Sequence, residues 1–136
     1  MLNVPVSVEY GLRAMVYLAQ KYADGKAIRA AEIASRGGLP LPFLQRLLAR
    51  LQRAGLVTSL RGAHGGYRLA RPPATIPVLQ VVEALTAPSA RPTRSPSALD
   101  FLWQRGLEAW RETLHVSLAE VADEVARRER NYTYQI

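Results

Sequence analysis

The stretch GLVTSLRGAHGGYRLARPP, residues Gly55–Pro73, decides the fold of this 136-residue chain. Its segments Val57–Arg61 and Tyr67–Ala70 are short, rich in strand-forming residues and bounded by turn residues, as β-strands are. The segment between them, Gly62–Gly66, is rich in glycine, which allows a tight turn. The stretch therefore predicts a β-hairpin, which the rigid Pro72–Pro73 pair follows.

A helix is predicted directly before the hairpin. It begins at Pro42, because proline suits the first helical position, and Gly55 ends it. Its apolar residues recur at helical spacing and form the predicted buried face: Phe43, Leu44, Leu47, Leu48 and Leu51. The residues on the opposite face are Gln45, Arg46, Ala49, Arg50 and Arg53.

Three further helices are predicted around this helix. Apolar spacing indicates an amphipathic helix over residues 6–23, a second over 30–36 and another over 77–85. Gly37–Gly38 ends the second helix, so a short turn joins it to the helix before the hairpin, as in helix-turn-helix motifs. Together these elements predict a mainly α-helical fold with a small β-hairpin wing, which is a winged helix-turn-helix.

The net charge of +7 is concentrated in one part of the chain. Residues 26–71 contain nine basic residues and one acidic residue, Glu32, whereas residues 72–136 contain seven basic and eight acidic residues. A positive field confined to the helix-turn-helix and the hairpin is typical of a nucleic-acid footprint. A solvated basic face is the alternative interpretation, and the coincidence with the wing pattern argues against it.

The helix before the hairpin supplies candidate DNA contacts. Recognition helices read bases mainly with their N-terminal residues, which makes Gln45 and Arg46 the candidates for base contacts. Glutamine pairs bidentately with adenine, and arginine does so with guanine. Arg50 and Arg53 are candidates for phosphate contacts. An ordinary surface helix with solvated arginines is the alternative for each of these residues.

The hairpin supplies a second set of candidates. Arg61 is the candidate for a minor groove, because a slim turn that carries an arginine fits a narrow, electronegative groove. The glycines of the tip permit positive φ angles and a tight, low-profile turn. A phosphate-binding loop is excluded, since such loops lead into a helix and the sequel YRLARPP cannot start one. The wing residues predicted to contact DNA are Arg61, Gly62, His64, Gly65, Gly66 and Arg68.

The last third of the chain predicts a loop and two helices. Residues 88–98 are rich in proline and serine and lack an apolar period, which predicts the loop. A long helix follows, and the Ser117–Glu120 capping box starts the last one. The long helix carries an apolar seam suited to packing against another helix: Leu99, Trp103, Leu107, Trp110 and Leu114. The alternative is that the two tryptophans fill an intramolecular core.

The composition excludes several kinds of site. The chain has no cysteine, which excludes disulfides, thiolate zinc sites and cysteine-ligated iron–sulfur clusters. No apolar run approaches the ~20 residues of a membrane span, and the start MLNVPVSVEY does not resemble a signal peptide, so we expect a cytoplasmic protein without a membrane partner. His64 and His115 fall in no catalytic pattern. We therefore expect no enzyme activity, no metal and no cofactor.

Four motifs carry a resemblance to a known family. They are EYGLRAMVYLA at 9–19, AEIA at 31–34, LPLPFLQRLL at 39–48 and AGLVTSLRGAHGGYRLARPP at 54–73. This pattern resembles the Rrf2 (IscR/NsrR/CymR-like) family of bacterial winged helix-turn-helix transcription regulators, over nearly the whole chain. Cluster-binding members of that family carry three cysteines between the fourth and fifth helices. The chain therefore resembles a cysteine-free branch.

The resemblance implies a homodimeric regulator that binds a pseudo-palindromic operator in double-stranded DNA. It implies a DNA-binding domain at 1–87, a loop at 88–98 and dimerisation helices at 99–136. It also assigns base recognition to Gln45 and Arg46, although many relatives have glutamate at the position of Gln45, so the base preference differs. A cluster-free repressor of this kind responds to a partner protein or a small-molecule effector. A protein-interaction adaptor with incidental DNA binding and an RNA-binding winged helix are the alternatives.

Overall fold

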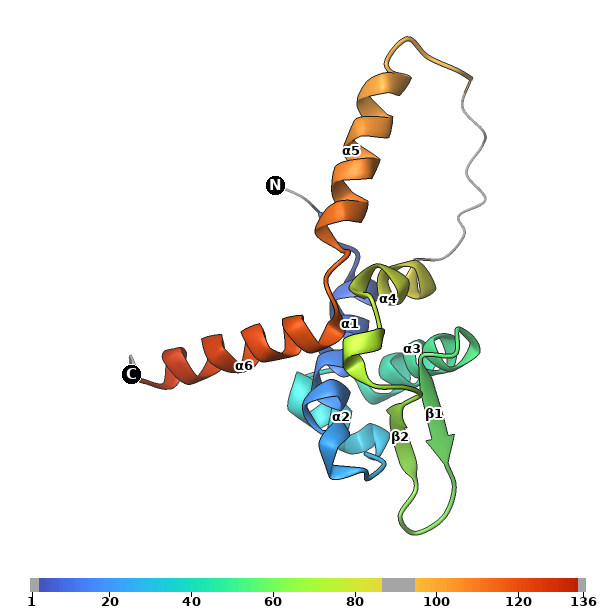
Figure 1. The fold of residues 1–136 in the computed structure, drawn as a ribbon. Coiled ribbons are helices and arrows are strands. Elements are labelled where there is room, and N and C mark those ends of the chain that lie inside the picture. Colours follow the sequence, from blue (N-terminus) through green and yellow to red (C-terminus); the bar gives the residue numbers. More distant parts are fainter. Residues whose placement is uncertain (1–2, 87–94, 135–136) are drawn as a thin grey trace.

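The computed structural model describes residues 3–86 and 95–134, and the fold is mainly helical (Figure 1). The helices are α1 (Val6–Gln20), α2 (Ala30–Gly37), α3 (Leu41–Arg53), α4 (Val78–Leu85), α5 (Asp100–Thr113) and α6 (Leu118–Tyr134). The strands are β1 (Val57–Leu60) and β2 (Gly66–Leu69), and 3₁₀ turns lie at Tyr22–Asp24 and Pro73–Thr75. The prediction of a mainly α-helical fold with a small hairpin is confirmed.

Helix α3 has the buried face that its apolar spacing predicts. Its almost fully buried side chains are Leu44, Leu47, Leu48 and Leu51. Phe43 is only partly buried, because its ring lies at the border of the core, edge-on to Tyr10 of α1 with 5.8 Å between ring centroids. The helix begins at Leu41, one residue before the predicted start, and Gly55 follows its end with a φ of 75°. The leucines thus fix which face of α3 points to solvent.

Helix α1 packs against α2, α3 and α4. Its α-helical bonding ends at Gln20, earlier than predicted, and the chain tightens into the 3₁₀ turn Tyr22–Asp24. The Tyr17 hydroxyl of α1 donates to Glu32 Oε1 of α2, with 2.7 Å between the oxygens. Burial, and then the bond to Glu32, raise the pKa of Tyr17 above its ordinary value. We refer to α1–α4 together with the hairpin as the head.

The hairpin is a two-stranded sheet to which one further β-bridge is added. Strands β1 and β2 pair in antiparallel fashion, with Val57 opposite Leu69, and β2 begins at Gly66, one residue early (Figure 1). Ile28, in the segment before α2, forms a further antiparallel bridge with Tyr67. The two backbone hydrogen bonds of this bridge measure 2.8 and 2.7 Å. The helix-turn-helix and the wing are therefore joined through the backbone before α2.

Helices α5 and α6 leave the head in different directions (Figure 1). The predicted capping box is confirmed: the Glu120 N–H donates to Ser117 Oγ at 3.1 Å, and the Ser117 N–H donates to the Glu120 carboxylate at 3.3 Å. Helix α6 packs against α1, and its Leu118 and Ala122 are buried in the core of the head. The start of α6 is therefore firmly attached to the head.

Part of the predicted loop at 88–98 lies outside the described residues, because 87–94 are not described. Residues 95–98 are exposed and lead into α5. The division of the chain at 1–87 and 99–136 stays a prediction. None of the described helices is long and apolar enough to cross a membrane.

Candidate DNA interface

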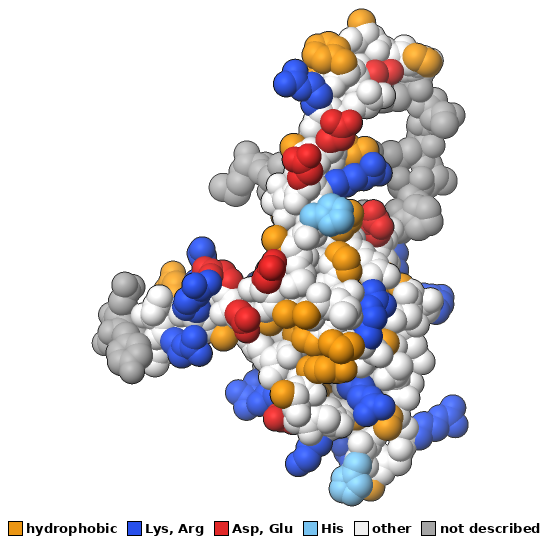
Figure 2. All heavy atoms as spheres, viewed as in Figure 1, with side chains coloured by type: hydrophobic (Ala, Val, Ile, Leu, Met, Phe, Trp, Pro, Cys, Tyr) orange, Lys and Arg blue, Asp and Glu red, His pale blue; other side chains and the backbone are white. Residues whose placement is uncertain are grey.

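Basic side chains gather on the part of the molecule that contains α2, α3 and the wing. Figure 2 shows lysine and arginine side chains around the lower half of the view, whereas acidic side chains lie mainly over α5 and the start of α6. This agrees with the excess of basic residues between positions 26 and 71. Among the described residues, no charged side chain is buried, so these charges face solvent.

The N-terminal half of α3 presents both predicted base-reading residues of this helix side by side. Gln45 and Arg46 are both exposed, and Arg53 is exposed near the end of the same helix. The guanidinium carbon of Arg46 lies 5.8 Å from the centroid of the Phe43 ring, a cation–π contact that holds Arg46 at the helix surface. Such an exposed polar helix face is what insertion into a major groove requires.

Arg50, the other candidate for a phosphate contact on α3, also makes a contact within the protein. Its Nη1 donates to the carbonyl oxygen of Leu85 at the end of α4, at 3.3 Å, and the residue is partly buried. The reason is its position at the edge of the exposed face, one turn after the buried Leu47. In the protein without DNA, Arg50 therefore joins α3 to α4.

Replacing Arg50 with alanine is expected to lower the free energy of unfolding by about 0.5–1.5 kcal/mol, because the Leu85 carbonyl loses a hydrogen-bond donor. Replacing the exposed Arg53 with alanine is expected to change it by less than about 0.5 kcal/mol. Urea unfolding followed by circular dichroism measures both variants. Equal stabilities would contradict the structural role of Arg50.

The wing tip carries the predicted arginine on an open turn. Arg61 and His64 are exposed at the tip, and Arg68 is exposed on β2. Gly62 and Gly66 have positive φ angles of 105° and 145°, a conformation that glycine permits. The predicted wing residues thus lie together at one end of the molecule.

Gly65 shapes the turn in a different way from Gly62 and Gly66. Its φ angle is not positive. A Cβ at this position would lie 2.4 Å from the carbonyl oxygen of Leu60 and 2.9 Å from that of Gly62. The Gly65 N–H also donates to the Gly62 carbonyl at 2.9 Å. The turn therefore needs glycine here for close approach of the backbone.

The apolar seam of α5 has an exposed part and a packed part. Leu99, Trp103 and Leu107 are 51%, 53% and 47% exposed. Trp110 and Leu114, at the C-terminal end of the helix, are partly buried against the core of the head. Trp110 thus packs within the chain, whereas Trp103 lies on the surface. An exposed apolar stripe of this kind is typical of a protein-binding surface.

Two further exposed residues enlarge this apolar surface and were not predicted as part of it. Phe101 and Leu102 of α5 are 60% and 48% exposed. Their apolar character is visible in the sequence, but they fall outside the spacing of the seam. The apolar surface near the start of α5 is therefore wider than a single stripe.

Two side chains that shape the wing were also missed. Arg29 Nη2 donates to the carbonyl oxygen of Ala63 in the wing tip, at 2.9 Å. Gln52 Nε2 of α3 donates to Ser59 Oγ of β1, at 3.2 Å. No spacing in the sequence signals these bonds, because each depends on how two separate elements pack. They attach the wing to the helix-turn-helix on two sides.

A family model matches residues 5–126 of the chain: Rrf2, an iron-dependent transcriptional regulator. The residues present do not fit a cysteine-ligated iron–sulfur cluster, because the chain has no cysteine. The described part of the chain also contains no group of three or more His, Asp or Glu residues that could hold a metal ion. The chain thus matches the family model without any cysteine that could ligate iron.

Two relatives show how far the likeness extends. The chain is 42% identical over 77 residues to the HTH-type transcriptional regulator IscR of Cereibacter sphaeroides, in a match that covers 56% of this chain and 50% of that protein. It is 33% identical over 132 residues to a protein of Mycobacterium tuberculosis that is named as an HTH-type transcriptional regulator. That match covers 89% of this chain and 81% of that protein. The match therefore spans half of the first relative and most of the second.

Solved structures share the fold. The structure of T. potens IscR has a TM-score of 0.80 and 34% identity, with 91% of this chain and 88% of that chain covered. The structure of CymR, the global cysteine regulator of B. subtilis, has a TM-score of 0.78 and 31% identity, with 91% of this chain and 98% of that chain covered. Since the family model, the identities and the fold agree, the chain belongs to the Rrf2 family of transcriptional regulators.

Proposed function

We propose that this transcriptional regulator binds a pseudo-palindromic operator in double-stranded DNA as a homodimer. In this proposal α3 enters the major groove, where Gln45 and Arg46 read bases, and the wing places Arg61 at a minor groove. The observation that carries the proposal is the exposure of arginines on α3 and on the wing, two neighbouring elements that the Gln52–Ser59 hydrogen bond joins. Phosphate contacts from Arg53 and Arg68 would add affinity without sequence preference.

The exposed part of α5 supports the homodimer. Leu99, Trp103 and Leu107 form an apolar stripe on a helix that projects from the head (Figure 1). Pairing of this stripe with that of a second copy would bury it and would place two heads on one DNA duplex. Two heads related by a two-fold axis read two half-sites, about 34–36 Å or a multiple of it apart. A dimer therefore explains why the operator should be palindromic.

The direct test is selection of bound sequences from random double-stranded DNA with the full chain. An enriched palindrome with regularly spaced half-sites supports the proposal. Enrichment of a sequence without symmetry would contradict binding as a two-fold dimer, and no enrichment at physiological salt would contradict sequence-specific binding. A reporter gene that carries the selected operator within its promoter tests repression, which we propose to occur when the bound protein blocks the promoter.

Operator affinity is expected to depend steeply on salt, because basic side chains release counterions from DNA phosphates. With six phosphate contacts by the dimer, log K should fall against log salt with a slope of about −5. Titrations of labelled operator at several salt concentrations measure this slope. A slope near zero would contradict the proposed role of the basic surface.

An adaptor that acts through another protein is the second candidate function. The observation that favours it is the apolar surface at the start of α5, where Phe101 and Leu102 lie beside the seam. A protein effector or a small molecule is also expected to control the regulator. An adaptor would lack sequence-selective DNA binding, whereas a regulator with a partner protein would retain it.

A further inference from the structure

We propose that Arg29 is a positioning residue: it fixes the wing tip for DNA binding and acts through Arg61 rather than on DNA. Arg29 precedes α2 and belongs neither to the recognition helix nor to the hairpin. The inference rests on the proposed function, in which Arg61 enters a minor groove. It adds a residue whose task is to hold the groove-reading element in place.

The first support is a direct bond from Arg29 to the tip. Its Nη2 donates to the Ala63 carbonyl oxygen at 2.9 Å, although the two residues are 34 positions apart in the chain. A charged donor makes a stronger hydrogen bond than a neutral one. Ala63 follows Arg61 by two residues, so this bond acts on the backbone that carries the proposed groove-reading arginine.

The second support is that the stem of the hairpin is attached to the same segment. Ile28, the neighbour of Arg29, exchanges two backbone hydrogen bonds with Tyr67, at 2.8 and 2.7 Å. Gly66 makes this approach possible, since a Cβ there would lie 2.4 Å from the Ile28 carbonyl oxygen. The backbone of Ile28 thus holds the stem, and the side chain of Arg29 extends the attachment to the tip.

The tip has little else to hold it. Residues 61–65 lie beyond the last strand pair, in which Leu60 faces Gly66. The hydrogen bond from the Gly65 N–H to Gly62 closes the turn, but it connects the tip only to itself. Among the hydrogen bonds of the described residues, that of Arg29 is the one that links positions 61–65 to the helix-turn-helix. Its loss should therefore free the tip while leaving the stem paired.

Trypsin cleavage after Arg61 in the protein without DNA tests this directly, because proteolysis follows the population of locally opened chain. Arg29→Ala is expected to raise the cleavage rate after Arg61 about 2- to 10-fold, the factor that corresponds to one lost hydrogen bond. The matched control is Arg36→Ala, which removes the same charge from the exposed surface of α2. Unchanged cleavage in Arg29→Ala, or an equal rise in the control, overturns the proposal.

Both substitutions affect exposed side chains, so each is expected to leave the melting temperature close to that of the wild type. Thermal unfolding of the two variants checks this before cleavage is compared. A general loss of stability in Arg29→Ala, with faster cleavage throughout the head, would show a structural role instead and would overturn the proposal.

Operator binding by four proteins tests the link to Arg61: wild type, Arg29→Ala, Arg61→Ala and the double variant. If Arg29 acts through Arg61, Arg29→Ala weakens binding about 2- to 10-fold in the wild type and has no further effect in Arg61→Ala. If the two losses multiply, Arg29 contacts DNA independently and the proposal is wrong. Failure of the wild type to bind any operator would refute the proposed function, whereas the cleavage assay would still decide whether Arg29 holds the tip.

Discussion

Replacing Arg61 with alanine is expected to weaken operator binding by about 1–3 kcal/mol, which is a loss of about 5- to 150-fold in affinity. Arg61 is exposed at the tip of the wing, where its guanidinium can enter a narrow minor groove with strong negative potential. Replacing Gln45 with alanine is expected to cause a loss of similar size through a major-groove contact. Titrations of labelled operator measure both losses.

The two variants should also differ in selectivity. Arg61→Ala should reduce the preference for A·T-rich sequence where the wing lies, because such sequence narrows the minor groove. Gln45→Ala should instead relax the preference at one base pair under α3. Operators with single base-pair changes distinguish these effects. Unchanged affinity and selectivity in both variants would refute the assignment of α3 and the wing as the DNA-reading elements.

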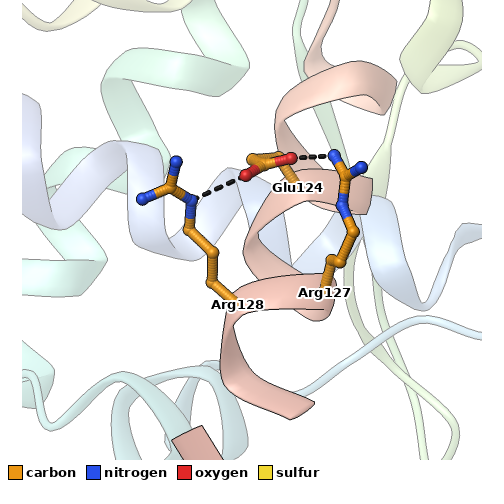
Figure 3. Close-up of polar contacts among 3 residues, drawn as sticks. All are labelled: Glu124, Arg127 and Arg128. Carbon is orange, nitrogen blue, oxygen red and sulfur yellow. Dashed lines mark hydrogen bonds and ion pairs between the residues drawn. The ribbon is translucent and has the colours of Figure 1, made fainter. Parts of the chain in front are cut away.

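The matched control for Arg61→Ala is Arg128→Ala on α6. Arg128 is highly exposed, and its Nε lies 2.7 Å from Glu124 Oε1, while Arg127 contacts the other oxygen of the same carboxylate (Figure 3). The substitution removes one positive charge from a helix outside the proposed interface. We expect less than about a twofold loss of operator affinity. A loss as large as that of Arg61→Ala would mean that net charge, rather than position, controls binding.

Replacing Leu107 with glutamate is expected to convert the proposed homodimer into monomers. Leu107 is 47% exposed in the single chain and would be buried in the dimer, where an unpaired carboxylate costs several kcal/mol in each subunit. Trp103→Glu should have the same effect. Separate heads lose the avidity of two half-sites, so operator affinity should fall about 10²- to 10⁴-fold. Sedimentation velocity and operator titration measure the two effects.

Gln104→Glu provides the control on the same helix. It adds the same charge at an exposed polar position that does not belong to the apolar seam. This variant should remain dimeric and should bind the operator with an affinity close to that of the wild type. Dimers of Leu107→Glu as stable as those of the wild type would show that the exposed part of α5 is not the dimer interface.

Much of the fold could be predicted from the sequence because its signals are local. The leucines of α3 recur at helical spacing, so their burial follows from the period of the helix. The Ser117–Glu120 capping box involves residues within one helical turn, and the structure contains both of its hydrogen bonds. The hairpin strands were placed within one residue, since the glycines between them define the turn.

The candidate site was only partly predictable, because some of its features depend on contacts between elements that are distant in the chain. The exposure of Gln45, Arg46 and Arg61 follows from helix period and turn position. The hydrogen bond from Arg50 to the Leu85 carbonyl does not, because it depends on the end of α4 lying beside α3. Gly65 was identified as a turn glycine, but the close approach of the Leu60 carbonyl, which excludes a Cβ, exists only in the folded turn.

The sequence by itself determined the segment 55–73 as a basic hairpin after an amphipathic helix, because strand, turn and helix patterns are properties of neighbouring residues. Tertiary structure alone decided how that hairpin is held. The bridge between Ile28 and Tyr67 and the bond from Arg29 to Ala63 join residues more than 30 positions apart. Such contacts form only when α2, α3 and the wing have packed around one core, and no local pattern in the chain specifies them.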